Sequence, residues 1–183
     1  MKKAVISVLG SDGPGIIATV TDVLYKLDCN IENVSQTILQ SEFSGIFIIG
    51  MDQALGEAVL EGHLRHALSD RNMTVHVKHL PPAPAVECPT CEPFIITTRG
   101  PDQKGLVARI TRIIADFGVN VTNLQAVFKG GNDPGANIMI YEVDIPLDTD
   151  TQALRQALRS KAEELSLAIS IQHKQVFEAI NRV

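Results

Sequence analysis

The chain has 183 residues, 45% of them hydrophobic and 4% aromatic, and its formal net charge at pH 7 is −5. With no Trp and no stripe of Lys and Arg, this composition argues against direct binding of nucleic acid. The apolar run Ala4–Leu9 is too short for a signal peptide and no segment has the length of a membrane span, so we expect a cytoplasmic protein that does not bind membranes. Three cysteines, an odd number, argue against a disulfide framework.

The first copy of a β-α-β-β-α-β pattern occupies the N-terminal half. Apolar and polar alternation and helical spacing predict the following elements: strand Lys3–Leu9, turn Gly10–Pro14, helix Gly15–Leu27, strand Cys29–Leu39, strand Phe43–Met51, helix Gln53–Asp70 and a last strand from Met73. Asp12 is expected to cap the first helix, and Pro14 suits its first turn because proline lacks the N–H that has no partner there.

The second half repeats this order. The expected elements are strand Phe94–Arg99, helix Gly105–Phe117, strand Val119–Lys129, strand Ala136–Ile145, helix Thr151–Leu165 and strand Leu167–His173. Gly118 is expected to end the first helix in a left-handed conformation. We therefore predict an α+β fold of two ferredoxin-like βαββαβ domains, each an antiparallel sheet with helices on one face.

The two halves are also similar in sequence. Residues 4–37 align with residues 94–127 at a constant offset of 90, without a gap. The pairs that are identical are Ile6/Ile96, Gly10/Gly100, Asp12/Asp102, Gly15/Gly105, Ala18/Ala108, Thr21/Thr111, Asn30/Asn120 and Asn33/Asn123. A period this long indicates a duplicated domain, not a solenoid. We expect domains at 1–80 and 93–173, a proline-rich linker at 81–92 and a short tail at 174–183.

The shared motif is a strand, then G-x-D-x-x-G, then a helix, then N-[IV]-x-N on the next strand. A glycine after a strand lets a ligand approach the backbone, and a helix N-terminus offers unpaired N–H groups to a carboxylate. Asparagine amides supply donors and acceptors that suit an amino acid. The candidate ligand-binding residues are Gly10, Asp12, Gly13, Gly15, Asn30 and Asn33, and Gly100, Asp102, Lys104, Gly105, Asn120 and Asn123.

A purely structural interpretation of the same residues stays open. Asp12 and Asp102 could serve only as helix caps, and a capping carboxylate would repel an anionic ligand. The glycines and asparagines could equally be turn residues. Lys104 stands where the first copy has Pro14, so the two sites need not be equivalent.

Both copies resemble ACT domains, the small ligand-sensing modules of amino-acid metabolism. The resemblance covers nearly the whole chain and is carried by the pattern strand–[GP]-x-D-x-x-G-[IL]-[IV]-A–helix–[CV]-N-[IV]. Two tandem copies are most similar to the glycine cleavage system transcriptional repressor family, and the second copy also resembles the N-terminal domain of formyltetrahydrofolate deformylases. Such domains typically join their sheets side by side and bind amino acids at the interface. The resemblance implies that Gly10–Gly15 and Gly100–Gly105 line this site, with Asn30 and Asn120 nearby.

These observations lead to one favoured function and two alternatives. We expect a non-enzymatic regulator that binds a small amino acid, with glycine as one candidate, and acts on a protein partner. The resemblance implies that this partner is a DNA-binding regulator and that the chain forms a homodimer. The alternatives are a regulatory subunit of an enzyme such as a formyltetrahydrofolate-linked hydrolase, and an interaction module that binds no ligand.

No cofactor or catalytic residue is expected. The spacing of Gly10, Gly13 and Gly15 is GxxGxG, which is not a dinucleotide-binding fingerprint, and the chain has no P-loop. Cys88 and Cys91 form a CxxC motif in the expected linker. The motif is compatible with redox or zinc chemistry, but no second ligand pair lies nearby in sequence, so two reduced thiols in a loop are the simpler interpretation.

Overall fold

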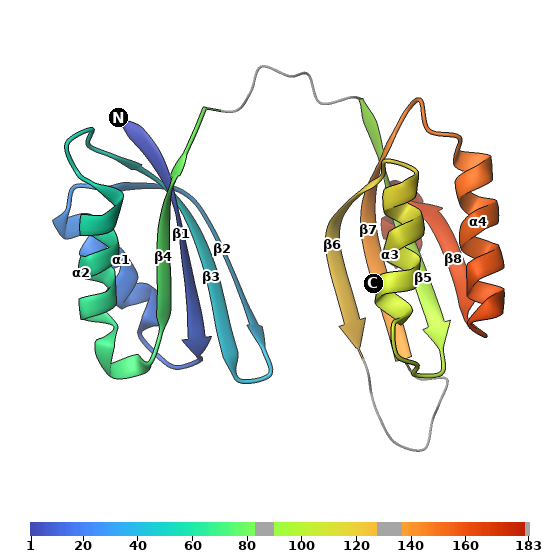
Figure 1. The fold of residues 1–183 in the computed structure, drawn as a ribbon, viewed down its shortest axis with the longest axis horizontal. Helices are drawn as coiled ribbons and strands as arrows, with labels where there is room; N and C mark the ends of the chain where they lie inside the picture. Colours follow the sequence, from blue (N-terminus) through green and yellow to red (C-terminus); the bar gives the residue numbers. More distant parts are fainter. Residues whose placement is uncertain (83–89, 128–136, 182–183) are drawn as a thin grey trace. The chain divides into compact units, whose positions relative to one another are not determined.

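A computed structural model describes residues 1–82, 90–127 and 137–181 (Figure 1). The chain divides into two compact units, Met1–Ala85, here called domain 1, and Val86–Val183, here called domain 2. Each is described by itself. Most of the expected linker, including Cys88, and the loop after β6 lie outside the described residues.

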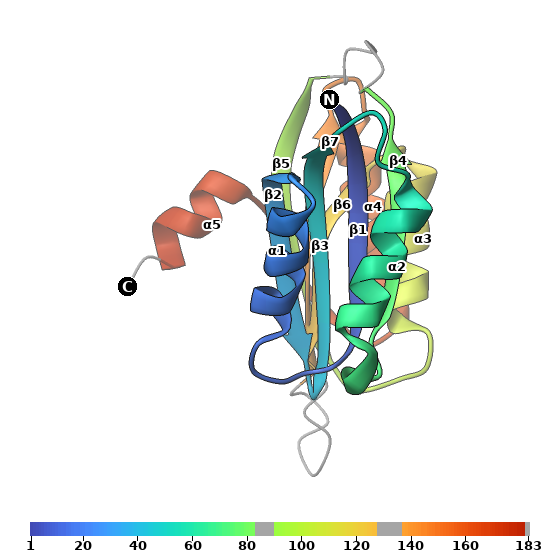
Figure 2. The same ribbon diagram turned by 90° about the vertical axis from the view of Figure 1, so that its left-hand side faces the viewer.

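Domain 1 has the predicted order of strands and helices. Its elements are β1 (Lys2–Ser11), α1 (Ile16–Lys26), β2 (Asn30–Leu39), β3 (Glu42–Met51), α2 (Glu57–Ala67), a short 3₁₀ turn (Ser69–Arg71) and β4 (Thr74–Leu80). The antiparallel sheet has the strand order β2-β3-β1-β4. Both helices cover one face of this sheet (Figures 1 and 2).

Domain 2 repeats the arrangement and adds a helix. Its elements are β5 (Cys91–Gly100), α3 (Leu106–Asp116), β6 (Asn120–Val127), β7 (Asn137–Pro146), α4 (Thr151–Glu164), β8 (Ala168–His173) and α5 (Lys174–Asn181). The strand order is β6-β7-β5-β8. Residues 174–181 of the tail are therefore helical, and Cys91 opens a strand where the sequence predicted linker.

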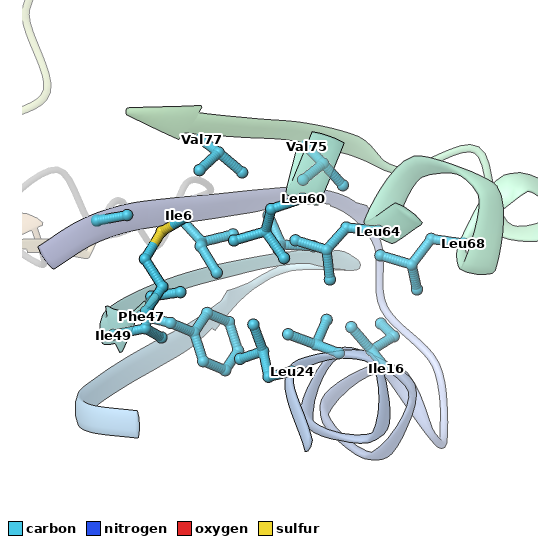
Figure 3. Close-up of a cluster of buried hydrophobic side chains, with 14 of the residues drawn as sticks. Ile6, Ile16, Leu24, Phe47, Ile49, Leu60, Leu64, Leu68, Val75 and Val77 are labelled. Carbon is cyan, nitrogen blue, oxygen red and sulfur yellow. The ribbon is translucent and has the colours of Figure 1, made fainter. Parts of the chain in front are cut away.

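The core of each domain lies between its sheet and its helices. Alternate residues of β1, such as Ile6 and Val8, are buried in this core. Figure 3 shows Ile6 lying on the same side as Leu24 of α1 and Leu60 of α2, which helical spacing turns toward the sheet. The same alternation and spacing build the core of domain 2. This core fixes which strand residues face the helices and which face away from them.

The helix ends explain how the chain returns to the sheet. Gly118 has φ 70, as predicted, and the N–H groups of Gly118 and Val119 donate to the carbonyls of Ala115 and Ile114. Asp28 takes the same left-handed conformation after α1, with φ 53. Both α1 and α3 therefore end in a turn that leads directly into the next strand.

Strand β1 is longer than the sequence predicted. It continues through Gly10 and Ser11, which pair with Phe43 and Glu42 of β3. Gly10 is thus a strand residue and not part of the turn. The alternation pattern could not show this extension, because the two added residues are polar or lack a side chain.

Candidate functional site

A shallow hollow of about 450 Å³ lies where β1 leads into α1. Its lining comes from the β1–α1 loop, the first turn of α1 and the β2–β3 hairpin: Asp12, Gly13, Gly15, Ile16, Ile17, Ala18, Gln36 and Phe43. Three of the predicted binding residues thus meet here. Gln36 and Phe43 were missed by the sequence analysis, because only the pairing of β2 and β3 brings them to the loop.

The first turn of α1 opens into this hollow without a side-chain cap. Gly15 is the N-cap residue, with φ 90, and no side chain accepts a hydrogen bond from the first turn. The carbonyl of Gly15 accepts from the N–H of Thr19, which closes the first helical turn. A helix N-terminus of this kind carries unpaired N–H groups and a partial positive charge, so it favours a carboxylate.

Asp12 is not the N-cap, contrary to the sequence prediction. The helix begins four residues later, at Ile16, and Pro14 precedes it. The backbone N–H of Asp12 donates to the carbonyl of Ser41 at 2.8 Å, which ties the loop to the β2–β3 hairpin. Among the described residues no hydrogen bond uses the Asp12 carboxylate, so this exposed anion borders the hollow and is suited to a ligand's ammonium group.

The conformation of the glycine at the start of each helix is special. Gly15 and Gly105 have backbone φ values of 90° and 83°, which residues other than glycine rarely adopt. The glycine is therefore needed to turn the chain into the helix at this point, whether or not a ligand binds.

Gly10 is required for packing, which corrects the expectation that it exposes backbone to a ligand. A Cβ atom at Gly10 would lie 2.7 Å from Sδ of Met73 and 3.1 Å from the carbonyl oxygen of Asn72. Gly100 is similar, since its Cβ would lie 2.9 Å from the carbonyl oxygen of Ser166. The missing side chains make room for the turn that precedes β4 or β8.

Each loop is also tied to that same turn by a side chain. In domain 1, Nη1 of Arg71 donates to the carbonyl of Pro14 at 2.8 Å. In domain 2 the donor lies on the loop itself, and Nε2 of Gln103 donates to the carbonyl of Leu165 at 2.8 Å. Arg71 thus places a cation beside the first loop, which the sequence did not reveal because 57 residues separate the two partners.

Domain 2 has a matching hollow of about 520 Å³ at its β5–α3 loop. The described residues that line it are Asp102, Gln103, Gly105, Leu106, Val107 and Ala108. Helix α3 likewise begins after an uncapped Gly105. Lys104 is exposed and is not among these lining residues, so the predicted cation does not face the hollow.

The four candidate asparagines do not border the loop of their own domain. Asn30 pairs with Gly50, which pairs with Lys3 at the opposite end of β1 from Gly10. A strand rises about 3.3 Å per residue, so these ends are roughly 20 Å apart. Asn120 occupies the same place in domain 2, paired with Asp144.

Asn33 and Asn123 follow a β-bulge shared by both domains and lie on the sheet face turned away from the helices. Nδ2 of Asn123 donates to Oε1 of Glu142 at 2.9 Å, so its amide is already used within the sheet. The shared N-x-x-N pattern thus marks the start of a bulged edge strand.

Residues 1–82, 90–127 and 137–181 contain no group of three or more His, Cys, Asp and Glu side chains that could hold a metal ion. None of the helices described there is both long enough and apolar enough to cross a membrane.

The family model for the ACT domain matches residues 2–78 and 92–172. A UPF0237 protein from Methanosarcina mazei is 30% identical over 95 residues, which cover 51% of this chain and 99% of that protein. A UPF0237 protein from Methanopyrus kandleri is 34% identical over 80 residues, covering 43% of this chain and 89% of that protein. These relatives correspond to about one of the two repeats.

Solved structures share the tandem architecture. A protein of unknown function from Galdieria sulphuraria superposes with a TM-score of 0.78 at 23% identity, covering 94% of this chain and 98% of that one. A protein named as a candidate glycine cleavage system transcriptional repressor superposes with a TM-score of 0.69 at 17% identity, covering 93% of this chain and 96% of that one. At these identities the likeness concerns the fold. Two ACT domains indicate a small-molecule-binding regulatory protein, and the chain belongs to the ACT-domain family as a tandem pair.

Proposed function

We propose that this protein is a non-enzymatic regulator that binds a small α-amino acid at the β1–α1 and β5–α3 loops. One observation carries the proposal: each loop presents an uncapped helix N-terminus and an aspartate to the same hollow. The ligand carboxylate would bind the free N–H groups of the first helical turn, and its ammonium group would pair with Asp12 or Asp102.

A zwitterion fits this arrangement better than a simple anion. The Asp12 carboxylate would repel an anion at the helix N-terminus, but it stabilises a ligand that carries an ammonium group a few ångströms from its carboxylate. The same argument applies to Asp102. This is why an α-amino acid, with glycine as the smallest candidate, is the ligand class we propose.

The asparagines constrain where a ligand could meet them. Since Asn30 lies roughly 20 Å from the loop of its own sheet, it could contact a bound amino acid only at a loop contributed by another ACT domain. The resemblance to domains that bind amino acids between joined sheets favours such an arrangement. Long β2, at the edge of its sheet, offers unpaired backbone groups for this association.

The partner that we propose is another protein. A net charge of −5 without a basic stripe gives DNA itself no electrostatic attraction. A DNA-binding regulator is the favoured class, because one protein of the same tandem fold is named as a candidate transcriptional repressor. The ligand would change the affinity for this partner by no more than the ratio of the ligand's own affinities for the two conformations of the protein, the one that binds the partner and the one that does not.

Calorimetry of the full chain with a panel of amino acids tests the ligand. We expect one or more small amino acids to bind, and the double variant Asp12→Ala/Asp102→Ala to lose at least about ten-fold in affinity, close to 1.4 kcal/mol. The control is Asp22→Ala, an exposed aspartate on α1 that pairs with Lys26. Absence of heat with every amino acid would instead favour an interaction module without a ligand.

A further inference from the structure

Helix α5 is docked on the sheet of domain 2. It contacts β5 and β8 on the side of the sheet away from α3 (Figure 2). Ile95 lies on this side, because its neighbours Phe94 and Ile96 belong to the core under the other helices. Only 5% of Ile95 is exposed. The segment that follows β8 is therefore a helix held against its own domain.

A histidine caps the N-terminus of α5. The backbone N–H of Gln175 donates to Nδ1 of His173 at 3.3 Å. His173 directly precedes Lys174, the first residue of the helix, so its side chain stands at the N-cap and accepts from the second helical residue. The usual capping residues keep their acceptor oxygen at neutral and mildly acidic pH, whereas a histidine loses its acceptor when it is protonated.

This hydrogen bond requires a neutral ring. The nitrogen that accepts carries no proton, so the capping ring holds its single proton on Nε2. The imidazolium form carries a proton on both nitrogens and cannot accept. It also places a positive charge at the positive end of a helix. Protonation of His173 therefore removes one hydrogen bond from α5 and adds a repulsion at the same helix end.

The capping ring is held by elements other than α5. The rings of His173 and Phe94 of β5 meet edge to face, with centroids 5.2 Å apart and planes at 73°. The guanidinium carbon of Arg155 on α4 lies 5.5 Å from the centroid of Phe94, and Nη1 of Arg155 donates to the carbonyl of Ile171 at 3.1 Å. The body of domain 2 thus presents the cap to the helix.

The charged groups around His173 are mostly positive. Arg155 approaches from α4 and Lys174 from α5, and Glu142 of β7 is bound to Lys174. Glu92 lies on the same face of β5 as the partner of His173, but in the described part of the chain the two form no ion pair. A protonated His173 would therefore join two cations and have no carboxylate of its own.

The second attachment of α5 does not titrate in the same range. The hydrogen bond from Lys174, followed by that from Asn123, holds the pKa of Glu142 below its ordinary value of 4.5. The ion pair between Lys174 and Glu142 therefore persists while a histidine changes its charge. A pH-dependent change at α5 between neutral and mildly acidic pH must then come from the cap.

We infer that His173 is a pH-dependent switch for α5: its neutral ring caps the helix and keeps it docked on β5 and β8, and its protonated ring releases it. Histidine side chains ordinarily change charge near about pH 6.5. Because docking requires the neutral form, docking is stable above this range and weakens as pH falls through it.

A pH titration of the full chain followed by NMR, without added amino acid, tests this switch. The Cα chemical shifts of residues 175–181 report the docked, helical fraction of α5, and the ring shifts of His173 report its protonation. Between about pH 8 and about pH 5 we expect the ratio of released to docked α5 to rise at least about five-fold, close to 1 kcal/mol. The midpoint should coincide with that of the His173 ring.

Two variants separate the cap from the charge. His173→Asn keeps an uncharged cap at every pH, so α5 should stay docked throughout the titration. His173→Ala removes the cap, so α5 should be released to a similar extent at both ends of the range. His79→Asn is the matched control, because His79 pairs with Ala4 at the place in domain 1 where His173 pairs with Phe94 in domain 2. The control should keep the wild-type transition.

Three outcomes overturn the inference: Cα shifts of α5 that stay constant while the His173 ring titrates, a transition that persists in His173→Asn, or a transition that disappears in His79→Asn. The first would show that the cap does not hold the helix, and the other two would assign the titration to another group. Because no amino acid is present, each outcome leaves the proposed ligand binding to its own test by calorimetry.

Discussion

Nζ of Lys174 lies 2.7 Å from Oε2 of Glu142, so the first residue of α5 is bound to the middle of the sheet of domain 2. Oε1 of the same carboxylate accepts from Asn123 on the neighbouring strand. Glu142 thus links β6, β7 and α5 through one side chain. The hydrogen bond from Lys174, followed by that from Asn123, holds the pKa of Glu142 below its ordinary value of 4.5.

The contribution of Glu142 to stability should depend on pH. A lowered carboxyl pKa means that the ionised form stabilises the folded state above the unfolded pKa, and that this stabilisation disappears as pH falls through the folded pKa. We expect Glu142→Gln to lower the unfolding free energy at pH 7 by about 1 kcal/mol or less, because both partners are partly exposed. The difference from wild type should vanish well below pH 4.5, as measured by urea unfolding across that range. An equal difference at pH 7 and pH 3 would contradict this origin.

Gly10→Ala should destabilise domain 1. The new Cβ would meet Met73 and the backbone carbonyl of Asn72, and overpacking of this kind typically costs about 1–3 kcal/mol. Gly13→Ala is the matched control on the same loop, because nothing lies within 4 Å of its Cβ position. Thermal melting measures the loss of stability in both variants. Comparable losses in the two would show that the close contact at Gly10 is not the cause of the destabilisation.

Arg71→Ala should loosen the β1–α1 loop. It removes the hydrogen bond to the carbonyl of Pro14, worth about 1 kcal/mol for a partly exposed group. Amide hydrogen exchange at Gly13, Gly15 and Ile16 should accelerate, while exchange in the strands stays unchanged. Gln103→Ala is the counterpart in domain 2, where the loop should respond in the same way. Unaltered exchange in the loops would mean that other contacts hold them.

In the described part of the chain, Asp150 is the one aspartate whose side chain caps a helix. It accepts hydrogen bonds from the first turn of α4. Its Oδ1 accepts from the N–H groups of Gln152 and Ala153, at 3.1 and 2.9 Å. Asp150→Ala should therefore cost about 1 kcal/mol, whereas Asp150→Asn should be close to neutral because asparagine caps equally well. Chemical unfolding of the two variants measures the difference. A large loss with Asn would indicate that the charge, and not the hydrogen bonds, is what matters.

The helix-cap prediction failed at Asp12 for a physical reason that Asp150 makes clear. Asp150 lies directly before its helix, at Thr151, whereas Gly15 separates Asp12 from α1 and turns the chain with a positive φ. The sequence presents the same residue type before both helices. Gly13, Pro14 and Gly15 lie between Asp12 and the first residue of α1, and none lies between Asp150 and Thr151. Whether an aspartate reaches the free N–H groups depends on this spacing and on the backbone conformation of the intervening residues, and residue type alone does not determine it.

The sequence by itself determined the duplication, the order of strands and helices, the fold class and the loops where the candidate sites lie. These depend on periods of two and 3.6 residues and on a repeat of 90, all of which are local or translational patterns. Only the tertiary structure decided that Asn30 and Asn120 lie at the far end of their sheets from the candidate loops, that Arg71 holds the first loop, and that α5 packs against β5 and β8. Strand register and long-range packing set those relationships, and partners tens of residues apart leave no periodic mark in the sequence.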